Sequence, residues 1–218
     1  MLKRMVPSAL RGLAANSSGI AFTEFALALP VLLTLGLGGL EIAHYALAIQ
    51  ECSQIAMTAA DNASRVRISI DETDVNDVLT GAKLVGTNIG FAANGRIILS
   101  DLEQSTSDTT KQWIRWQRCS GAKNVTSSYG TPNAMSSSTM TAMGPTGNQI
   151  AATTAPTAVM FVQVSYAYQP LISNIWIGGA RTINTTSAFN VRQRTDQTLY
   201  NTSNLSTSQI SSCSTFSA

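Results

Sequence analysis

The pattern of apolar and polar positions divides the chain into a long apolar stretch, an amphipathic middle and a distal half of short alternating segments. Residues 25–40 contain no charged side chain, and the apolar character extends over residues 20–49 when the flanking turns are included. As an α-helix this longer stretch would measure about 45 Å, which exceeds the roughly 30 Å hydrocarbon core of a bilayer. The pattern therefore predicts a membrane-spanning helix whose ends project into both interfaces.

The helical periodicity continues past the apolar stretch. No glycine or proline interrupts Glu41 to Ile70. Within this segment apolar or small residues recur in steps of three and four, and we call this row the seam: Tyr45, Ile49, Cys52, Ala56, Ala59, Ala63, Val66 and Ile70. A seven-residue period predicts one continuous helical face. We expect one helix from about Ile20 to Val66, whose small alanines suit packing against a sheet or another helix better than a free coiled coil.

A second helix is predicted directly after the first. Residues 69–72 fit a capping box in which Ser69 caps the helix and Glu72 reaches back. Apolar residues at helical spacing follow over about 71–89, and Gly90 and the pair Asn94–Gly95 then end the helix and turn the chain.

The distal half predicts strands. The segments with β-prone or alternating composition are 96–102, 112–118, 159–168 and 182–192. In the third segment Met160, Val162, Val164, Tyr166 and Tyr168 share one side, and in the fourth Ile183, Phe189 and Val191 do so. A small antiparallel sheet of about four strands beside a long helix is an α+β fold.

Two segments are too polar for a packed core of their own. Of the 38 residues 120–157, 24 are Ser, Thr, Gly, Pro or Asn, and the tail from about Thr195 has a similar composition. Such composition favours a flexible insertion between strands. A surface-binding or glycosylated loop is the functional alternative.

These patterns give the following expected organisation. The chain divides into a basic leader (1–19), a transmembrane helix (20–48), periplasmic helices (49–90), a periplasmic β-rich region (91–194) with the flexible insertion (120–157), and a polar tail (195–218).

The distribution of charged residues predicts how the chain is oriented in a membrane. Three bases, Lys3, Arg4 and Arg11, precede the apolar stretch without any acid, so the positive-inside rule places the N-terminus in the cytoplasm. A cleaved signal peptide is the alternative, with Ala46–Leu47–Ala48 as its cleavage site, but its length would far exceed the usual 15–30 residues. Apart from this leader the chain has no basic excess that would predict nucleic-acid binding.

The distal half of the sequence lacks the residue combinations that catalytic, phosphate-binding or metal sites commonly use. The single histidine, His44, lies at the end of the apolar stretch, where we expect an interfacial position, and the only acid after Asp108 is Asp196. Neither a catalytic triad nor a carboxylate pair is available there, and no glycine-rich phosphate loop or metal-ligand spacing occurs. We expect no enzyme, no cofactor and no metal.

The three cysteines leave alternatives open. Cys119 and Cys213 would both lie in an oxidising compartment, where a bridge would tie the tail to the sheet. Cys52 lies on the seam, where a small buried thiol packs well. We favour a Cys119–Cys213 disulfide; three free cysteines or a Cys52 crosslink between subunits are the competing possibilities.

One motif at the start of the apolar stretch gives the chain a family resemblance. The run Gly19-Ile20-Ala21-Phe22-Thr23-Glu24-Phe25-Ala26-Leu27-Ala28-Leu29-Pro30 places a glutamate five residues after a glycine. It resembles the TadE/TadG-like pseudopilins of the tight-adherence (Tad/Flp) pilus assembly system, with Glu41 as the second glutamate near the helix end. The resemblance covers about residues 11–66, and the chain length suits the E type.

The resemblance implies a minor pilin-like inner-membrane protein that serves the assembly of an adhesive pilus. It implies cleavage after Gly19 by a prepilin peptidase, and as partners other pilin-like subunits, the inner-membrane Tad assembly platform and the lipid bilayer, but no nucleic acid. Glu24 could pair with the new amine of Ile20 on a neighbouring subunit and set the axial register. The alternative for Glu24 is a solvated carboxylate at the cytoplasmic interface. The alternative function is an unprocessed, membrane-anchored envelope binding protein or adhesin.

Overall fold

A computed structural model describes residues 18–153 and 157–218, so the predicted leader lies outside the described residues except at its last two positions. The elements follow in this order: α2 (Ser18–Arg65), β1 (Ile70–Asp71), α3 (Glu72–Val85), η1 (Thr87–Ile89), α4 (Phe91–Asn94), β2 (Gly95–Gln104), β3 (Gln112–Ser120), η2 (Met135–Ser137), β4 (Ala158–Ala167), η3 (Asn174–Ile177), β5 (Thr182–Asn190) and β6 (Leu199–Tyr200).

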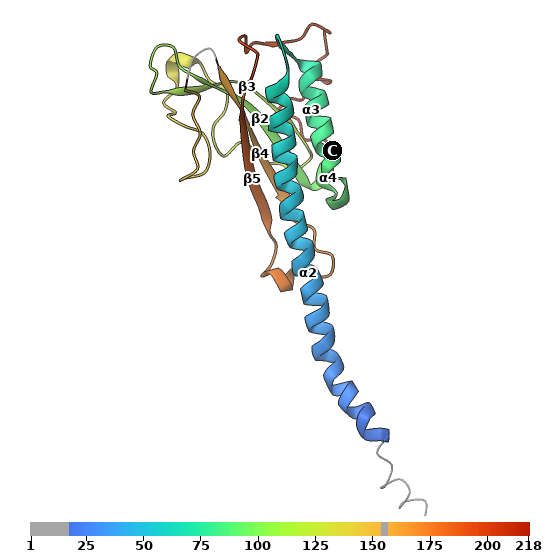
Figure 1. The fold of residues 1–218 in the computed structure, drawn as a ribbon. Coiled ribbons are helices and arrows are strands. Elements are labelled where there is room, and N and C mark those ends of the chain that lie inside the picture. Colours follow the sequence, from blue (N-terminus) through green and yellow to red (C-terminus); the bar gives the residue numbers. More distant parts are fainter. Residues whose placement is uncertain (1–17, 154–156) are drawn as a thin grey trace, which may run out of the picture.

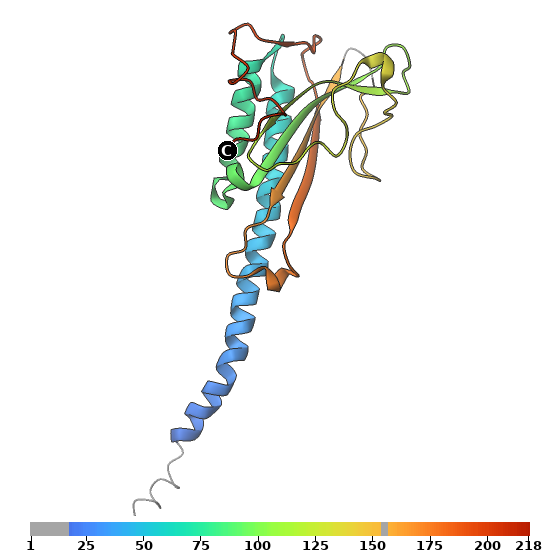
Figure 2. The same ribbon diagram turned by 180° about the vertical axis from the view of Figure 1, so that it is seen from behind.

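Helix α2 confirms the predicted long helix. Its first half extends away from the rest of the molecule, and its second half packs against the sheet (Figure 1). The helix continues through Pro30 and bends in its projecting half, as expected where a proline removes a backbone hydrogen bond (Figure 2). It is long and apolar enough to cross a membrane, and no part of its most apolar window is buried within the protein.

The four predicted strands form one antiparallel sheet in the order β3-β2-β4-β5. Helices α2 and α3 cover one face of this sheet (Figure 1). The architecture is therefore α+β, as the sequence predicts.

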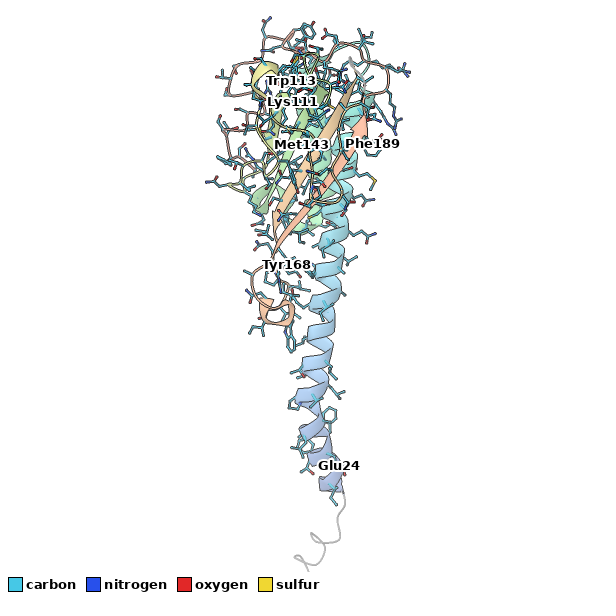
Figure 3. The ribbon with its side chains drawn as sticks, turned by 90° about the vertical axis from the view of Figure 1, so that its left-hand side faces the viewer. Glu24, Lys111, Trp113, Met143, Tyr168 and Phe189 are labelled. Carbon is cyan, nitrogen blue, oxygen red and sulfur yellow. A yellow bond between two sulfur atoms is a disulfide. The ribbon has the colours of Figure 1, made fainter. Side chains whose placement is uncertain are left out.

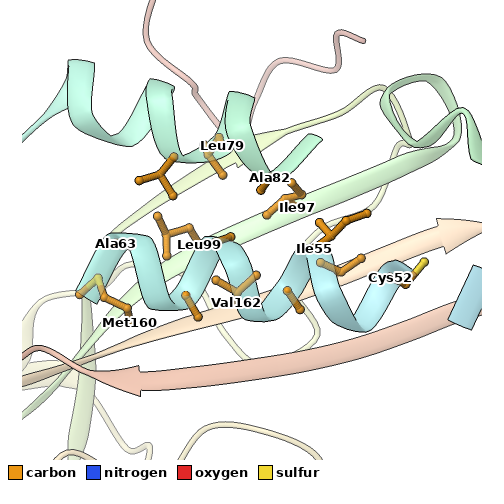
Figure 4. Close-up of a cluster of buried hydrophobic side chains, with 14 of the residues drawn as sticks. Cys52, Ile55, Ala63, Leu79, Ala82, Ile97, Leu99, Met160 and Val162 are labelled. Atoms are coloured by element: carbon orange, nitrogen blue, oxygen red, sulfur yellow. The ribbon is translucent and has the colours of Figure 1, made fainter. Parts of the chain in front are cut away.

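The main core lies between this face and the two helices (Figure 4). The seam alanines Ala56, Ala59 and Ala63 are fully buried. The residues predicted to share a side of the third strand, from Met160 in β4 to Tyr168 just after it, all belong to the same core. Because alanine has almost no side chain, the helix axis can lie close to the sheet, where larger residues such as Leu79 and Val162 fill the space.

The start of α3 corrects the predicted cap. Asp71, not Ser69, is the N-cap: its side chain accepts from the backbone N–H of Thr73, and Asp74 accepts from the N–H of Asp71. Glu72 instead forms an ion pair with Arg118 on β3. Both alternatives satisfy the capping pattern, but short Asp71 and Asp74 side chains suit it and leave the longer Glu72 to reach the sheet.

The opposite face of the sheet carries a second, smaller core. Residues from the predicted insertion, Met143 and Ala152, are buried against Leu102, Ile114 and Phe161 of the strands. The insertion thus buries more apolar surface than its composition suggests. Its flexibility stays a prediction, and residues 154–156 lie outside the described ones.

Candidate functional site

The predicted processing segment lies at the exposed beginning of α2. Gly19 has open space around the position of a Cβ atom, and Ile20 and Glu24 are exposed. Thr23 donates its hydroxyl to the Ile20 carbonyl at 2.8 Å, within the first turns of the helix. No ion pair within residues 18–153 and 157–218 includes Glu24, which lies at the far end of the helix from Tyr168 (Figure 3).

The second glutamate, Glu41, has an entirely different environment. It is fully buried although it belongs to the helix that projects from the domain. One carboxylate oxygen accepts from the Tyr168 hydroxyl at 2.6 Å, and the other accepts from the Ile172 amide at 2.7 Å. Longer contacts join the amides of Leu171 and Ser173 to the same carboxylate. A buried carboxylate with this many donors is well compensated for the loss of water.

His44 completes this polar group, which we call the Glu41 cluster (Glu41, His44, Tyr168 and the amides of residues 171–173). Its Nδ1 lies 2.8 Å from the Tyr168 hydroxyl, and the edge of the Tyr45 ring meets the Tyr168 ring at a centroid distance of 5.0 Å. Tyr168 donates to Glu41, so the imidazole nitrogen can donate to the phenol oxygen. Burial, followed by the hydrogen bond to Glu41, raises the pKa of Tyr168.

The cluster joins α2 to the connection between β4 and β5, a role of Glu41 that was not predicted from the sequence. It identified Glu41 only as the second glutamate of a motif and His44 as an interfacial residue. A signal was present, because an uncompensated carboxylate at the end of an apolar helix is unfavourable and needs donors. Which segment supplied them could not be derived without the fold.

The cysteine assignment is resolved. Cys119 and Cys213 form a disulfide with a Cα–Cα distance of 4.7 Å, and Cys52 is a buried free thiol. Burial raises the pKa of Cys52 to about 12, so its reactive thiolate is disfavoured.

The bridge is one of several attachments of the tail. The buried Arg96 donates to the carbonyls of Cys213 and Thr215 and lies 4.2 Å from the Phe216 ring centroid. Strand β6 also pairs with β1 in parallel.

Other chemistry has little support in the described part of the chain. Across residues 18–153 and 157–218, no group of three or more His, Cys, Asp and Glu residues is arranged to hold a metal ion. An apolar depression of about 430 Å³ lies between α3 and α4 beside Leu84 and Phe91.

The described residues define a class of protein, in which a membrane-capable helix continues directly into an α+β domain. Residues 19–61 match the family model described as TadE-like protein, which confirms the resemblance over the segment that includes Gly19, Glu24 and Glu41. Neither the curated proteins nor the solved structures contain a match.

Proposed function

We propose that this protein is a minor pilin-like, TadE-type inner-membrane protein that serves the assembly of an adhesive Tad/Flp pilus. The observation that carries the proposal is the family match over residues 19–61, which covers the projecting half of α2 and nearly all of its packed half. We call the four-stranded sheet, α3 and the segments packed on them the head. A helix with one end in lipid and the other end packed against a folded head is the arrangement that a pilin-like subunit needs. We infer a structural role rather than catalysis.

The proposed maturation step is cleavage between Gly19 and Ile20 by a prepilin peptidase. The spacing of Gly19 and Glu24 and the exposure of this end of α2 support it. The test is N-terminal sequencing of membrane-extracted protein from cells with an active prepilin peptidase, where we expect Ile20 as the first residue. Gly19→Phe should leave the precursor intact, with Gly36→Ala as a control that changes a glycine of the same helix away from the site.

Glu24 would then set the register between subunits by pairing with the amine of Ile20 on a neighbour. Its lack of an ion pair among the described residues of its own chain leaves it available for this role. Glu24→Ala should insert normally but impair pilus assembly, whereas Thr34→Ala, which alters another exposed polar residue of α2, should not. Normal pilus output from the Glu24 variant would contradict the register mechanism.

We further propose that the N-terminus faces the cytoplasm and the head faces the periplasm. A Cys119–Cys213 bridge supports this orientation because disulfides persist in oxidising compartments. The competing function is an unprocessed membrane-anchored binding protein or adhesin. An intact N-terminus in the presence of active peptidase would favour it.

A further inference from the structure

The connection between β4 and β5, residues 168–181, exposes apolar side chains beside the apolar half of α2. We call it the β4–β5 loop; it lies where the head is nearest to the projecting helix (Figures 1 and 2). Its exposed apolar residues are Leu171, Ile172, Ile175 and Trp176, and Ile175 is 78% exposed. Clustered apolar exposure of this kind indicates a contact site rather than a solvated loop.

The loop lies at a definite level along α2. Trp176 covers Gly38 so closely that a Cβ atom at this glycine would lie 2.8 Å from the indole ring. The charge-free stretch of α2 ends at Leu40. From Ile20 to Leu40 a helix measures about 30 Å, which matches the hydrocarbon core of a bilayer. If α2 spans the membrane with Ile20 near one boundary, the β4–β5 loop lies at the other.

Several backbone amides of the loop are hydrogen-bonded within the protein. Glu41 accepts from the amides of residues 171–173, and the Ser173 hydroxyl accepts from the Ile175 amide. The amides of Gly178 and Gly179 are bonded to carbonyls in η3. Because unpaired backbone groups are costly in lipid, this pairing lets the loop enter the interface.

The charge and the aromatic content of the loop also fit a lipid surface. Its only charged residue is Arg181, an exposed side chain whose Nε donates to the Ile177 carbonyl. An arginine near the boundary can place its guanidinium among phosphate headgroups. Tryptophan prefers the same depth because its ring is apolar and its N–H is polar.

We propose that the β4–β5 loop is a second membrane contact, which inserts Leu171, Ile175 and Trp176 into the headgroup–acyl boundary of the leaflet facing the head. This inference rests on the proposed membrane-spanning role of α2, because the loop surface is continuous with that helix. The head would then contact the bilayer at two points, through α2 and through the β4–β5 loop. Because the Glu41 cluster holds these two segments together, it would fix the tilt and rotation of the head relative to the bilayer.

Tryptophan quenching in vesicles tests the proposal directly. The full chain is reconstituted in phosphatidylethanolamine–phosphatidylglycerol vesicles that contain lipids brominated either near the headgroup or near the acyl end. The other two tryptophans, Trp113 and Trp116, are buried in the head, and Trp113 lies at its opposite end (Figure 3). We expect quenching of Trp176, stronger with the shallow bromines, and loss of this quenching in Trp176→Phe.

A helix reporter separates failure of this inference from failure of the proposed function. Leu32→Trp in the Trp176→Phe background places a probe in the middle of the apolar stretch of α2 and should be quenched by the deep bromines. If this probe is quenched but Trp176 is not, the loop proposal is overturned and the membrane helix stands. If neither is quenched, both are overturned.

A matched pair of charge variants provides a second measurement. Ile175→Asp places a carboxylate at the loop tip and should reduce the quenching of Trp176 by the shallow bromines. Ile68→Asp changes an equally exposed isoleucine between α2 and β1 and should leave it unchanged. Equal quenching of Trp176 in both variants would overturn the proposal.

Discussion

Two buried carboxylates of this protein have opposite surroundings. Glu41 accepts hydrogen bonds from a phenol and from loop amides, whereas neither carboxylate oxygen of Asp101 has a hydrogen-bond partner in the described part of the chain. Glu41 therefore organises a segment of the chain. Asp101, in the middle of β2, loses its hydration on burial, and no hydrogen bond from the described residues to its carboxylate offsets this cost.

The stability of the head should depend on the protonation of Asp101. Burial, and then the nearby Glu103, raise the pKa of Asp101, against the opposing influence of Arg194 and Arg115. The folded state therefore holds a proton that the unfolded state releases above about pH 4. Stability is unaffected by this group at lower pH and falls as pH rises towards the folded pKa, by at most about 1.4 kcal/mol per pH unit.

Asp101→Asn should remove this dependence. Its free energy of unfolding should equal that of the wild type near pH 3 and exceed it increasingly as the pH approaches 7. Denaturant unfolding in detergent across this range measures the difference. Asp108→Asn, which changes a half-exposed, hydrogen-bonded carboxylate of the β2–β3 turn, is the control and should show no such growing advantage. A constant difference for the Asp101 variant would contradict the interpretation.

Glu41 should hold the β4–β5 loop in place. Glu41→Ala removes the acceptor of the Tyr168 hydroxyl and of the amides at Ile172 and its neighbours, and each buried donor left unpaired costs about 1–3 kcal/mol. We expect faster hydrogen exchange at the amides of residues 171–173 in the variant, with unchanged exchange in β2. Exchange at these amides equal to that of the wild type would show that the carboxylate does not order the loop.

At the scale of elements, the two halves of α2 have different surfaces. The residues of α2 up to Leu40 are largely exposed and apolar, and those from Ala48 to Ala63 present a buried face of small residues to the sheet. The boundary between these two parts coincides with the Glu41 cluster. The sequence shows where α2 changes from a helix that is apolar on all sides to one that is apolar on a single face. A helix in lipid can be apolar on every side, whereas a sheet covers only one face of a helix.

Periodicity predicted most of the elements for the same physical reason. The inward side of β4 was predicted because alternate positions of a strand point to opposite faces, and Met160 and Tyr166 are indeed in the main core. The cap of α3 was misplaced because capping motifs tolerate several residue pairs within two positions. The second core was missed because the few apolar residues of the insertion, such as Met143, have no periodicity that indicates burial.

The long-range contacts of the candidate site could not be predicted from local sequence patterns. The pairing of Cys119 with Cys213 was favoured from compartment and placement. The attachment of Tyr168 to Glu41, however, joins residues 127 positions apart, and no local pattern specifies it. Such contacts depend on the position of the sheet edge relative to the helix, which packing of the whole core decides.

The seam should tolerate no increase in side-chain size. Ala59 is fully buried between α2 and the sheet, so Ala59→Leu must displace neighbours and should lower the free energy of unfolding by about 1–3 kcal/mol. Met57→Leu changes an exposed position two residues away and should alter stability by less than about 0.5 kcal/mol. Denaturant unfolding in detergent compares the two. Similar stabilities would show that the helix–sheet contact is looser than the structure indicates.

At the scale of the whole molecule, the head is attached to its helix by several independent connections. The main core holds the second half of α2, and the Glu41 cluster fixes the helix at the lower edge of the sheet. Within the head itself, the disulfide and the Arg96 contacts hold the tail to β3 and β2. The helix and head should therefore move as one body, so that the position of α2 in a membrane sets the position of every surface of the head.

The orientation of this body in the membrane is the last prediction. If the bases Lys3, Arg4 and Arg11 keep the N-terminus in the cytoplasm, the insertion at 120–157 faces the periplasm. Its exposed residues 146–150 should be cut by a broad-specificity protease added to spheroplasts, and mass spectrometry should locate the new ends there. The same protease added to intact cells, whose outer membrane excludes it, is the control. Protection in spheroplasts together with cleavage in inside-out vesicles would reverse the proposed topology, and the disulfide would then lie in a reducing compartment.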